Sequence, residues 1–122
     1  MAKKILLVDD AAFMRKKIKD TLTKAGYTEL FEAADGVDAL EKYTKLNPDL
    51  VIMDISMPNM DGLDALRAIC NADPDANVVI CSTMGQENTV IDAIRLGAKD
   101  FIVKPFKAER VLKTVTSILG NP

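Results

Sequence analysis

Side chains capable of metal and phosphoryl chemistry stand directly after four short apolar segments of this chain. These are ILLV followed by Asp9 and Asp10, LVIM followed by Asp54, VVIC followed by Ser82 and Thr83, and FIV followed by Lys104. Carboxylate oxygens are the ligands that hard cations such as Mg²⁺ prefer, and hydroxyl or ammonium groups bind phosphoryl oxygens. If these side chains converge, they form a site for a divalent cation and a phosphoryl group.

The apolar segments themselves are typical of buried parallel strands. Each is short and apolar, with branched side chains, and stretches with helical spacing separate them. The carboxyl ends of parallel strands lie along one edge of an open α/β sheet, where such proteins bind ligands. We therefore expect the carboxylates, the hydroxyls and the ammonium group to lie at a single edge.

Strands and helices are predicted to alternate along the whole chain, which indicates a three-layer, doubly wound α/β fold with a five-stranded parallel sheet. Polar positions in the second strand favour an edge place for it, as in the flavodoxin-like strand order 2-1-3-4-5. In the helix near residues 37–45, we expect Val37, Leu40 and Tyr43 to face inward. The length predicts one domain over residues 1–122, with no output domain. The predicted strands cover residues 4–8, 29–33, 50–53, 78–81 and 101–103.

The composition excludes several classes of function. Without histidine, the chain cannot build a Ser-His-Asp or Cys-His catalytic site, a His-ligated zinc site or a phosphohistidine carrier. The net charge is −2, but residues 88–122 hold 6 Lys and Arg against 3 Asp and Glu. That local excess fits either solvated helix faces or the docking of an acidic protein partner. Nucleic-acid binding is not expected, because no dense basic stripe with interleaved aromatic residues occurs.

The sequence also predicts where the protein works. No apolar stretch approaches the roughly 18 residues that span a bilayer, and the N-terminal apolar run is too short for a signal peptide. We expect a cytoplasmic monomer without membrane insertion. Cys70 and Cys81 lie on apolar faces of their segments and are predicted to be buried thiols.

Ordinary structural roles also fit some of the site residues. Asp9 or Asp10 can cap a helix, and Phe101 is by default a core aromatic residue. Capping does not explain an adjacent pair of carboxylates, because they repel each other unless a cation offsets their charge. Alone, Lys104 would be a solvated turn residue, but beside the acids it can bridge to Asp54 or hold an anionic oxygen.

Four motifs of this chain together resemble one protein family. They are LLVDDAAFMR, VIMDISMPNMDG, the hydroxyl residue after VVIC, and GAKDFIVKPF, and their order and spacing match the family pattern. Essentially the whole chain resembles the response-regulator receiver domain, and two of the motifs are most similar to its chemotaxis subgroup. The resemblance implies a two-component signalling protein that accepts a phosphoryl group and turns over no separate substrate.

The resemblance also implies a role for each residue of the site. Asp54 would accept the phosphoryl group from a phosphohistidine of a kinase, and Lys104 would pair with that group. Mg²⁺ would bind Asp10, Asp54 and the backbone carbonyl of Ser56 directly, and Asp9 through a water molecule.

A conformational switch is implied in the same way. Ser82 aligns with the hydroxyl residue that moves toward the phosphoryl group, and Phe101 with the aromatic residue that then turns inward. That movement would change the surface of the last strand and of the helices on either side of it. Thr83 stands where the family usually has alanine, so it can compete with Ser82 or hinder access to the acceptor. Ser56 and Met84 flank the site and are expected to influence the lifetime of the phosphorylated state.

The expected partners are a histidine kinase of the chemotaxis type, the flagellar motor switch and a phosphatase. A phosphorelay intermediate and a phosphorylation-independent binding module are the alternatives. A flavin-binding protein of the same fold is disfavoured, because Asp9 and Asp10 occupy the position of its phosphate loop and repel phosphate. A Mg²⁺-dependent phosphohydrolase would need a cap insertion, and the sequence has no segment for one.

Overall fold

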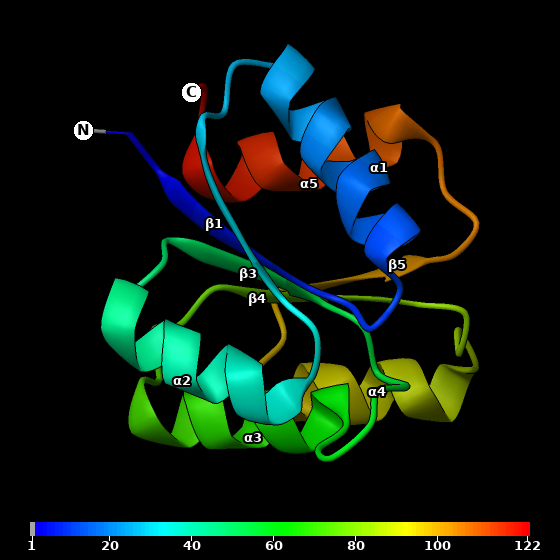
Figure 1. The fold of residues 1–122 in the computed structure, drawn as a ribbon. Coiled ribbons are helices and arrows are strands. Elements are labelled where there is room, and N and C mark those ends of the chain that lie inside the picture. The colour runs from blue at the N-terminus through cyan, green and yellow to red at the C-terminus, as the bar shows by residue number, and fades with distance from the viewer. Residues whose placement is uncertain (1) are drawn as a thin grey trace.

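A computed structural model of the protein describes residues 2–122 and shows a parallel five-stranded sheet between two layers of helices (Figure 1). The strands lie in the order β2-β1-β3-β4-β5, which confirms the predicted topology. The strands are β1 (Lys4–Val8), β2 (Glu29–Ala33), β3 (Leu50–Met53), β4 (Val78–Ser82) and β5 (Asp100–Val103). The helices are α1 (Ala12–Lys24), α2 (Gly36–Leu46), α3 (Gly62–Ala72), α4 (Glu87–Leu96) and α5 (Ala108–Leu119).

The two faces of the sheet bury separate apolar clusters. Helices α1 and α5 cover one face, and α2, α3 and α4 cover the other (Figure 1). All residues of β3 and β4 are buried, whereas β2 at the edge is mostly half-buried, as its polar positions predict. Removing these two apolar faces from water is the main contribution to the stability of such a fold.

Local signals in the sequence determine several helix ends. Asp35 and Asp61 cap α2 and α3, each accepting a hydrogen bond from a backbone N–H three residues later. Helix α4 ends at Gly97, whose φ of 119° suits glycine.

The longest helix, α1, has 13 residues. None of the helices between residues 2 and 122 combines the length and the apolar character needed to cross a bilayer.

Some details differ from the sequence prediction. Strand β4 runs one residue further than expected because its ladder with β5 continues to the pair Ser82 and Val103. The prediction that Val37 faces inward is wrong, since 43% of this residue is exposed. Helix α2 instead buries Gly36 and Ala39. A Cβ atom on Gly36 would lie only 2.4 Å from the carbonyl oxygen of Met60, so the close approach of the loop between β3 and α3 favours this face.

The two cysteines lie on opposite faces of the sheet. Cys81 is buried on the α1–α5 face, and Cys70 is half-buried between α3 and α4. Burial raises the pKa of the Cys81 thiol to about 11, so this thiol stays protonated at neutral pH. The prediction of a buried thiol is confirmed for Cys81 and holds in part for Cys70.

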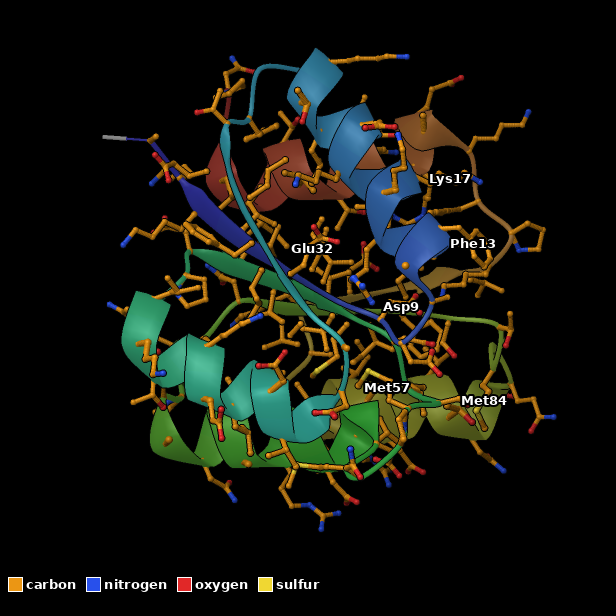
Figure 2. The ribbon with its side chains drawn as sticks, viewed as in Figure 1. Asp9, Phe13, Lys17, Glu32, Met57 and Met84 are labelled. Carbon is orange, nitrogen blue, oxygen red and sulfur yellow. The ribbon has the colours of Figure 1, made fainter. Side chains whose placement is uncertain are left out.

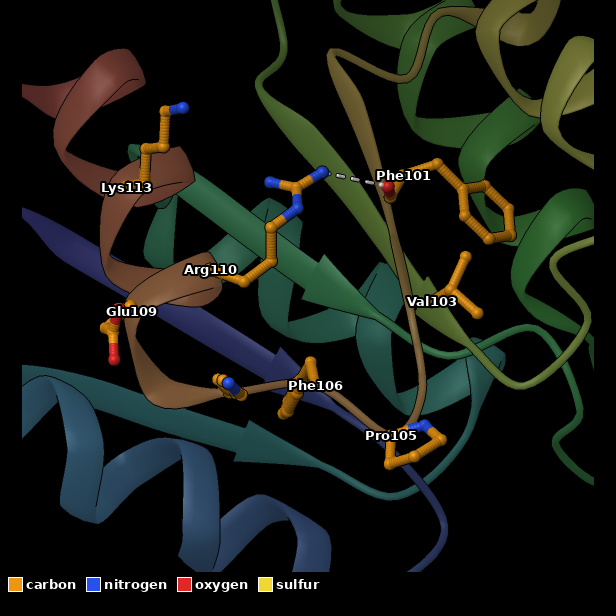
Figure 3. A pocket seen from close by; sticks show the side chains of 8 residues that line it. Phe101, Val103, Pro105, Phe106, Glu109, Arg110 and Lys113 are labelled. Carbon is orange, nitrogen blue, oxygen red and sulfur yellow. Dashed lines mark hydrogen bonds between the residues drawn. The ribbon is translucent and has the colours of Figure 1, made fainter.

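Strand β5 is tied to α5 by the guanidinium group of Arg110. Its nitrogens lie 3.2 and 3.3 Å from the two carboxylate oxygens of Asp100, and one of them donates to the carbonyl of Phe101 (Figure 3). The hydroxyl of Thr114 donates to the same carboxylate at 3.0 Å. Burial disfavours the charged form of Asp100, but hydrogen bonds from Arg110, Phe101 and Thr114 outweigh burial and lower its pKa.

We expect Arg110→Gln to destabilise the protein by about 0.5–1 kcal/mol at neutral pH, because both members of this pair are more than a third exposed and solvent screens them. A lowered pKa means that Asp100 stabilises the fold above its ordinary pKa of about 3.9, and that this contribution is lost as the pH falls through the lower folded-state value. Urea unfolding over this pH range should therefore show the variant and the wild type converging in acid. A difference that does not depend on pH, or an equal loss in the neighbouring Lys113→Gln control, would contradict this explanation.

Candidate functional site

Three carboxylates meet at the carboxyl edge of the sheet, as predicted. One oxygen each of Asp9, Asp10 and Asp54 lies within 4.8 Å of the others. The register of the sheet causes this proximity, because the last residues of β1 and β3, Val8 and Met53, are paired. The amide of Asp54 then donates to the carbonyl of Val8 at 2.9 Å, so the residues that follow the two strands emerge side by side.

Lys104 follows the edge strand β5, and its side chain reaches the carboxylates that follow β1 and β3. Its ammonium nitrogen lies 2.7 Å from one oxygen of Asp9 and 3.7 Å from one of Asp54, and its side chain is 10% exposed. Burial alone would lower the pKa of Lys104, but the hydrogen bond to Asp9 and the charge of Asp54 raise it above its usual value. Lys104 therefore remains positively charged beside Asp9 and Asp54 at neutral pH. The Lys104–Pro105 peptide is cis.

The surroundings of Asp54 disfavour its charged form. Burial raises its pKa and the negative charges of Asp9 and Asp10 act in the same direction, against the attraction of Lys104. Three carboxylates facing one lysine leave an excess of negative charge that a divalent cation can balance. Hard oxygen donors of this kind suit Mg²⁺, and opposite ligands of an octahedral Mg²⁺ lie only about 4 Å apart. The residues present therefore fit a Mg²⁺ site.

Helix capping is not the role of the adjacent acids. The N-cap of α1 is Ala11, with no side-chain hydrogen bond. One carboxylate oxygen of Asp9 instead accepts from the amide of Ala11 at 2.9 Å, and the other accepts from Lys104. Asp9 is 4% exposed, whereas Asp10 is exposed. The two acids thus occupy different environments in one cluster.

The other predicted site residues belong to β4 and β5 or to the loops after β3 and β4. Ser82 is fully buried, and its hydroxyl accepts from the amide of Met84 at 3.1 Å, whereas Thr83 is exposed. The hydroxyl of Ser56 donates to the sulfur of Met84 at 3.3 Å, so the loops after β3 and β4 touch. Phe101 is 7% exposed and already lies inward in this structure.

Two residues beside the cluster were not singled out from the sequence. Gly62 donates its amide to the carbonyl of Ile55 at 2.8 Å, and a Cβ atom at this position would lie 1.9 Å from the carbonyl oxygen of Asp54. In the sequence, the glycine at the end of the MPNMDG segment was the feature that could have indicated this close backbone contact. Arg15 bonds to the carbonyl of Asp9, and nothing in the local pattern distinguished it from the neighbouring lysines of α1.

Figure 2 shows Asp9 close to Phe13 of α1, with Met57 and Met84 at the same end of the molecule. Phe13 is 73% exposed and Met84 is 44% exposed. The acidic cluster therefore has apolar side chains near its mouth, a combination that offers a partner protein both charged and apolar contacts.

Residues 5–116 match the protein family described as the response regulator receiver domain. The chain belongs to this family. The receiver domain is 56% identical to the chemotaxis protein CheY of Bacillus subtilis over 120 residues, which cover 98% of this chain and all of that protein. It is 53% identical to CheY of Thermotoga maritima over 118 residues, with 97% of this chain and 98% of that protein covered.

Solved structures agree with this assignment of the receiver domain. The fold is similar to a chain in the crystal structure of the CheX–CheY–BeF3–Mg²⁺ complex from Borrelia burgdorferi, with a TM-score of 0.91 and 40% identity. The match covers 95% of this chain and 88% of that one. The receiver domain is thus a CheY-like chemotaxis response regulator and a signalling protein, as the motifs predicted. Receiver domains bind Mg²⁺ at an acidic pocket, and this chain has a cluster of three Asp side chains at the carboxyl edge of its sheet.

Proposed function

We propose that this receiver domain accepts a phosphoryl group on Asp54 from a chemotaxis-type histidine kinase and then signals to the flagellar motor switch. One observation carries the proposal. One carboxylate oxygen of Asp54 lies within 4.8 Å of one oxygen each of Asp9 and Asp10. An oxygen of Asp54 also lies 3.7 Å from the ammonium nitrogen of Lys104. A carboxylate nucleophile between a cation site and a fixed ammonium group is the arrangement that phosphoryl transfer requires.

In the proposed reaction, an oxygen of Asp54 forms a bond to phosphorus while the bond from phosphorus to the donor histidine nitrogen breaks. The product is an acyl phosphate on Asp54, and the electron pair of the broken bond stays on the imidazole. Lys104 holds the transferred oxygens through its positive charge. Asp10, Asp54 and the carbonyl of Ser56 would hold Mg²⁺, with Asp9 acting through water, and the ion supplies charge to offset that on the phosphoryl oxygens.

The experiment that tests this function is intact-mass measurement after incubation with acetyl phosphate and Mg²⁺. We expect a gain of one phosphoryl group that is lost again with time and that does not form when a chelator removes Mg²⁺. A folded protein that binds Mg²⁺ and yet gains no mass would contradict the proposal. It would favour the alternative of a binding module that works without phosphorylation.

The surface formed by α4, β5 and α5 supports the second part of the proposal. Three exposed apolar residues, Ile91, Ile94 and Val103, lie on α4 and β5. Next to them is a cavity of about 510 Å³ between β5 and α5, with Phe101 and Val103 on one side and Arg110 and Lys113 on the other (Figure 3). Lysine and arginine outnumber the one acidic residue of the lining, Glu109, so apolar contacts with a net positive charge suit an acidic segment of a partner protein.

Coupling between the site and this surface would run through Ser82 and Phe101. We propose that the Ser82 hydroxyl, which accepts from the amide of Met84, donates its proton to an oxygen of the phosphoryl group, and that this new hydrogen bond favours the inward position of Phe101. Binding of a motor-switch peptide should then tighten when beryllofluoride and Mg²⁺, a phosphoryl mimic, are added. Phosphoryl transfer to a histidine protein, without such tightening, would instead identify a phosphorelay intermediate.

A further inference from the structure

Arg15 of α1 connects the acidic cluster to the edge strand of the sheet. Its side chain is 17% exposed, which is low for an arginine near the surface. One terminal nitrogen of the guanidinium group donates to the backbone carbonyl of Asp9 at 2.5 Å, and the Nε atom donates to a carboxylate oxygen of Glu32 at 3.0 Å. Glu32 lies on β2, next to the strand that precedes Asp9 (Figure 2).

The contact with the carbonyl of Asp9 matters because of peptide geometry. The carbonyl of Asp9 and the amide of Asp10 belong to one planar unit, so fixing the carbonyl also fixes the direction in which the chain enters Asp10. The amide of Asp9 donates a hydrogen bond to the carbonyl of Ala33. The carboxylate of Asp9 accepts hydrogen bonds from the amide of Ala11 and the ammonium group of Lys104. Asp10 is exposed, and no hydrogen bond to its carboxylate occurs among the contacts of residues 2–122. Its position in the cluster therefore depends on its backbone.

We infer that Arg15 is a positioning residue for the metal site: it holds the Asp9–Asp10 peptide so that the Asp10 carboxylate stays beside Asp9 and Asp54. The inference rests on the proposed function, in which these acids hold Mg²⁺. Arginine suits this role because its planar fork donates in two directions at once, to a carbonyl and to a carboxylate. The guanidinium group acts on the metal only through the peptide.

The chain offers a matched control in Lys19. This lysine also contacts Glu32, at 3.5 Å, but within residues 2–122 the only hydrogen bond of its side chain is to that carboxylate and not to the Asp9 peptide. Replacing Lys19 therefore removes a positive charge and an ion pair from the same region while leaving the Asp9 carbonyl bonded. Arg15→Ala and Lys19→Ala differ mainly in whether the peptide before Asp10 is held.

The test is the dissociation constant of Mg²⁺, measured by calorimetry on the full chain. We expect Arg15→Ala to weaken Mg²⁺ binding about 10-fold, the lower end of the effect seen when the support of a metal ligand is removed. Loss of a positive charge near an acidic site would by itself tighten Mg²⁺ binding, so the two explanations differ in sign. Lys19→Ala should bind Mg²⁺ as tightly as the wild type or more tightly.

Arg15→Lys provides a second variant that keeps the charge but replaces the two donor nitrogens of the planar fork by a single one, and we expect it to weaken Mg²⁺ binding as well. In metal-free protein, nuclear magnetic resonance should show the Asp9 carbonyl and Asp10 amide signals shifted in both Arg15 variants and not in Lys19→Ala. Wild-type Mg²⁺ affinity in both Arg15 variants would overturn the positioning role. A wild-type protein that does not bind Mg²⁺ would instead overturn the proposed function.

Discussion

Asp54→Asn should accept no phosphoryl group from acetyl phosphate and, in metal-free buffer, should be more stable than the wild type. The amide is not a nucleophile that can form an acyl phosphate, so the expected loss of modification is complete. The gain in stability follows from the raised pKa of Asp54, which burial causes and the neighbouring acids increase. A raised pKa means that the folded state disfavours the ionised carboxylate, so stability falls as the pH rises above the ordinary value.

Asparagine removes that penalty at neutral pH while keeping nearly the same shape. We expect an increase of about 1 kcal/mol in the free energy of unfolding, which lies in the usual range for a single stabilising substitution. Urea unfolding in the presence of a chelator measures it, and intact mass measures the phosphoryl group. The matched control is Asp75→Asn, which replaces an exposed acid outside the cluster. Modification of Asp54→Asn at the wild-type level would show that another residue is the acceptor.

Gly62→Ala should destabilise the protein by about 3 kcal/mol, at the upper end for a residue too large for its site. A Cβ atom would lie 1.9 Å from the carbonyl oxygen of Asp54 and 2.8 Å from the Cα atom of Ile55. Both neighbours are backbone atoms, so no side-chain rotation relieves the overlap. Helix α3 or the loop after β3 must move, and that loop carries the acceptor.

The measurement is urea unfolding, combined with the rate of phosphorylation by acetyl phosphate in the folded fraction. Gly120→Ala is the control, because a Cβ atom there has no heavy atom within 4 Å. Its φ of 77° still disfavours alanine, so we expect a cost of about 1 kcal/mol at that position. If Gly62→Ala unfolds like the wild type and is phosphorylated at the same rate, α3 does not need to pack this closely on the acceptor loop.

The sequence by itself determined the α/β architecture and which side chains lie at the carboxyl edge of the sheet. Strand period, buried runs and turn signals are local properties, and they were sufficient to predict the five strands. Their order, which the structure confirms, came from the polar second strand together with the flavodoxin-like pattern of such folds. The convergence of Asp9, Asp10, Asp54 and Lys104 also followed from the sequence, because parallel strands end at a common edge. The roles of these residues in metal binding and phosphoryl transfer remain predictions.

Tertiary structure decided which atoms meet. The pairing of Lys104 with Asp9 joins residues 95 positions apart, and it depends on how four strands are staggered, which no local pattern records. The outward position of Val37 follows from the close approach of Met60 to Gly36, and the bond of Arg15 to the Asp9 carbonyl from the packing of α1 on β1. Hydrophobic periodicity specifies which face of an element is buried on average. Individual contacts depend on register and on the packing of whole elements, and these form only in the folded chain.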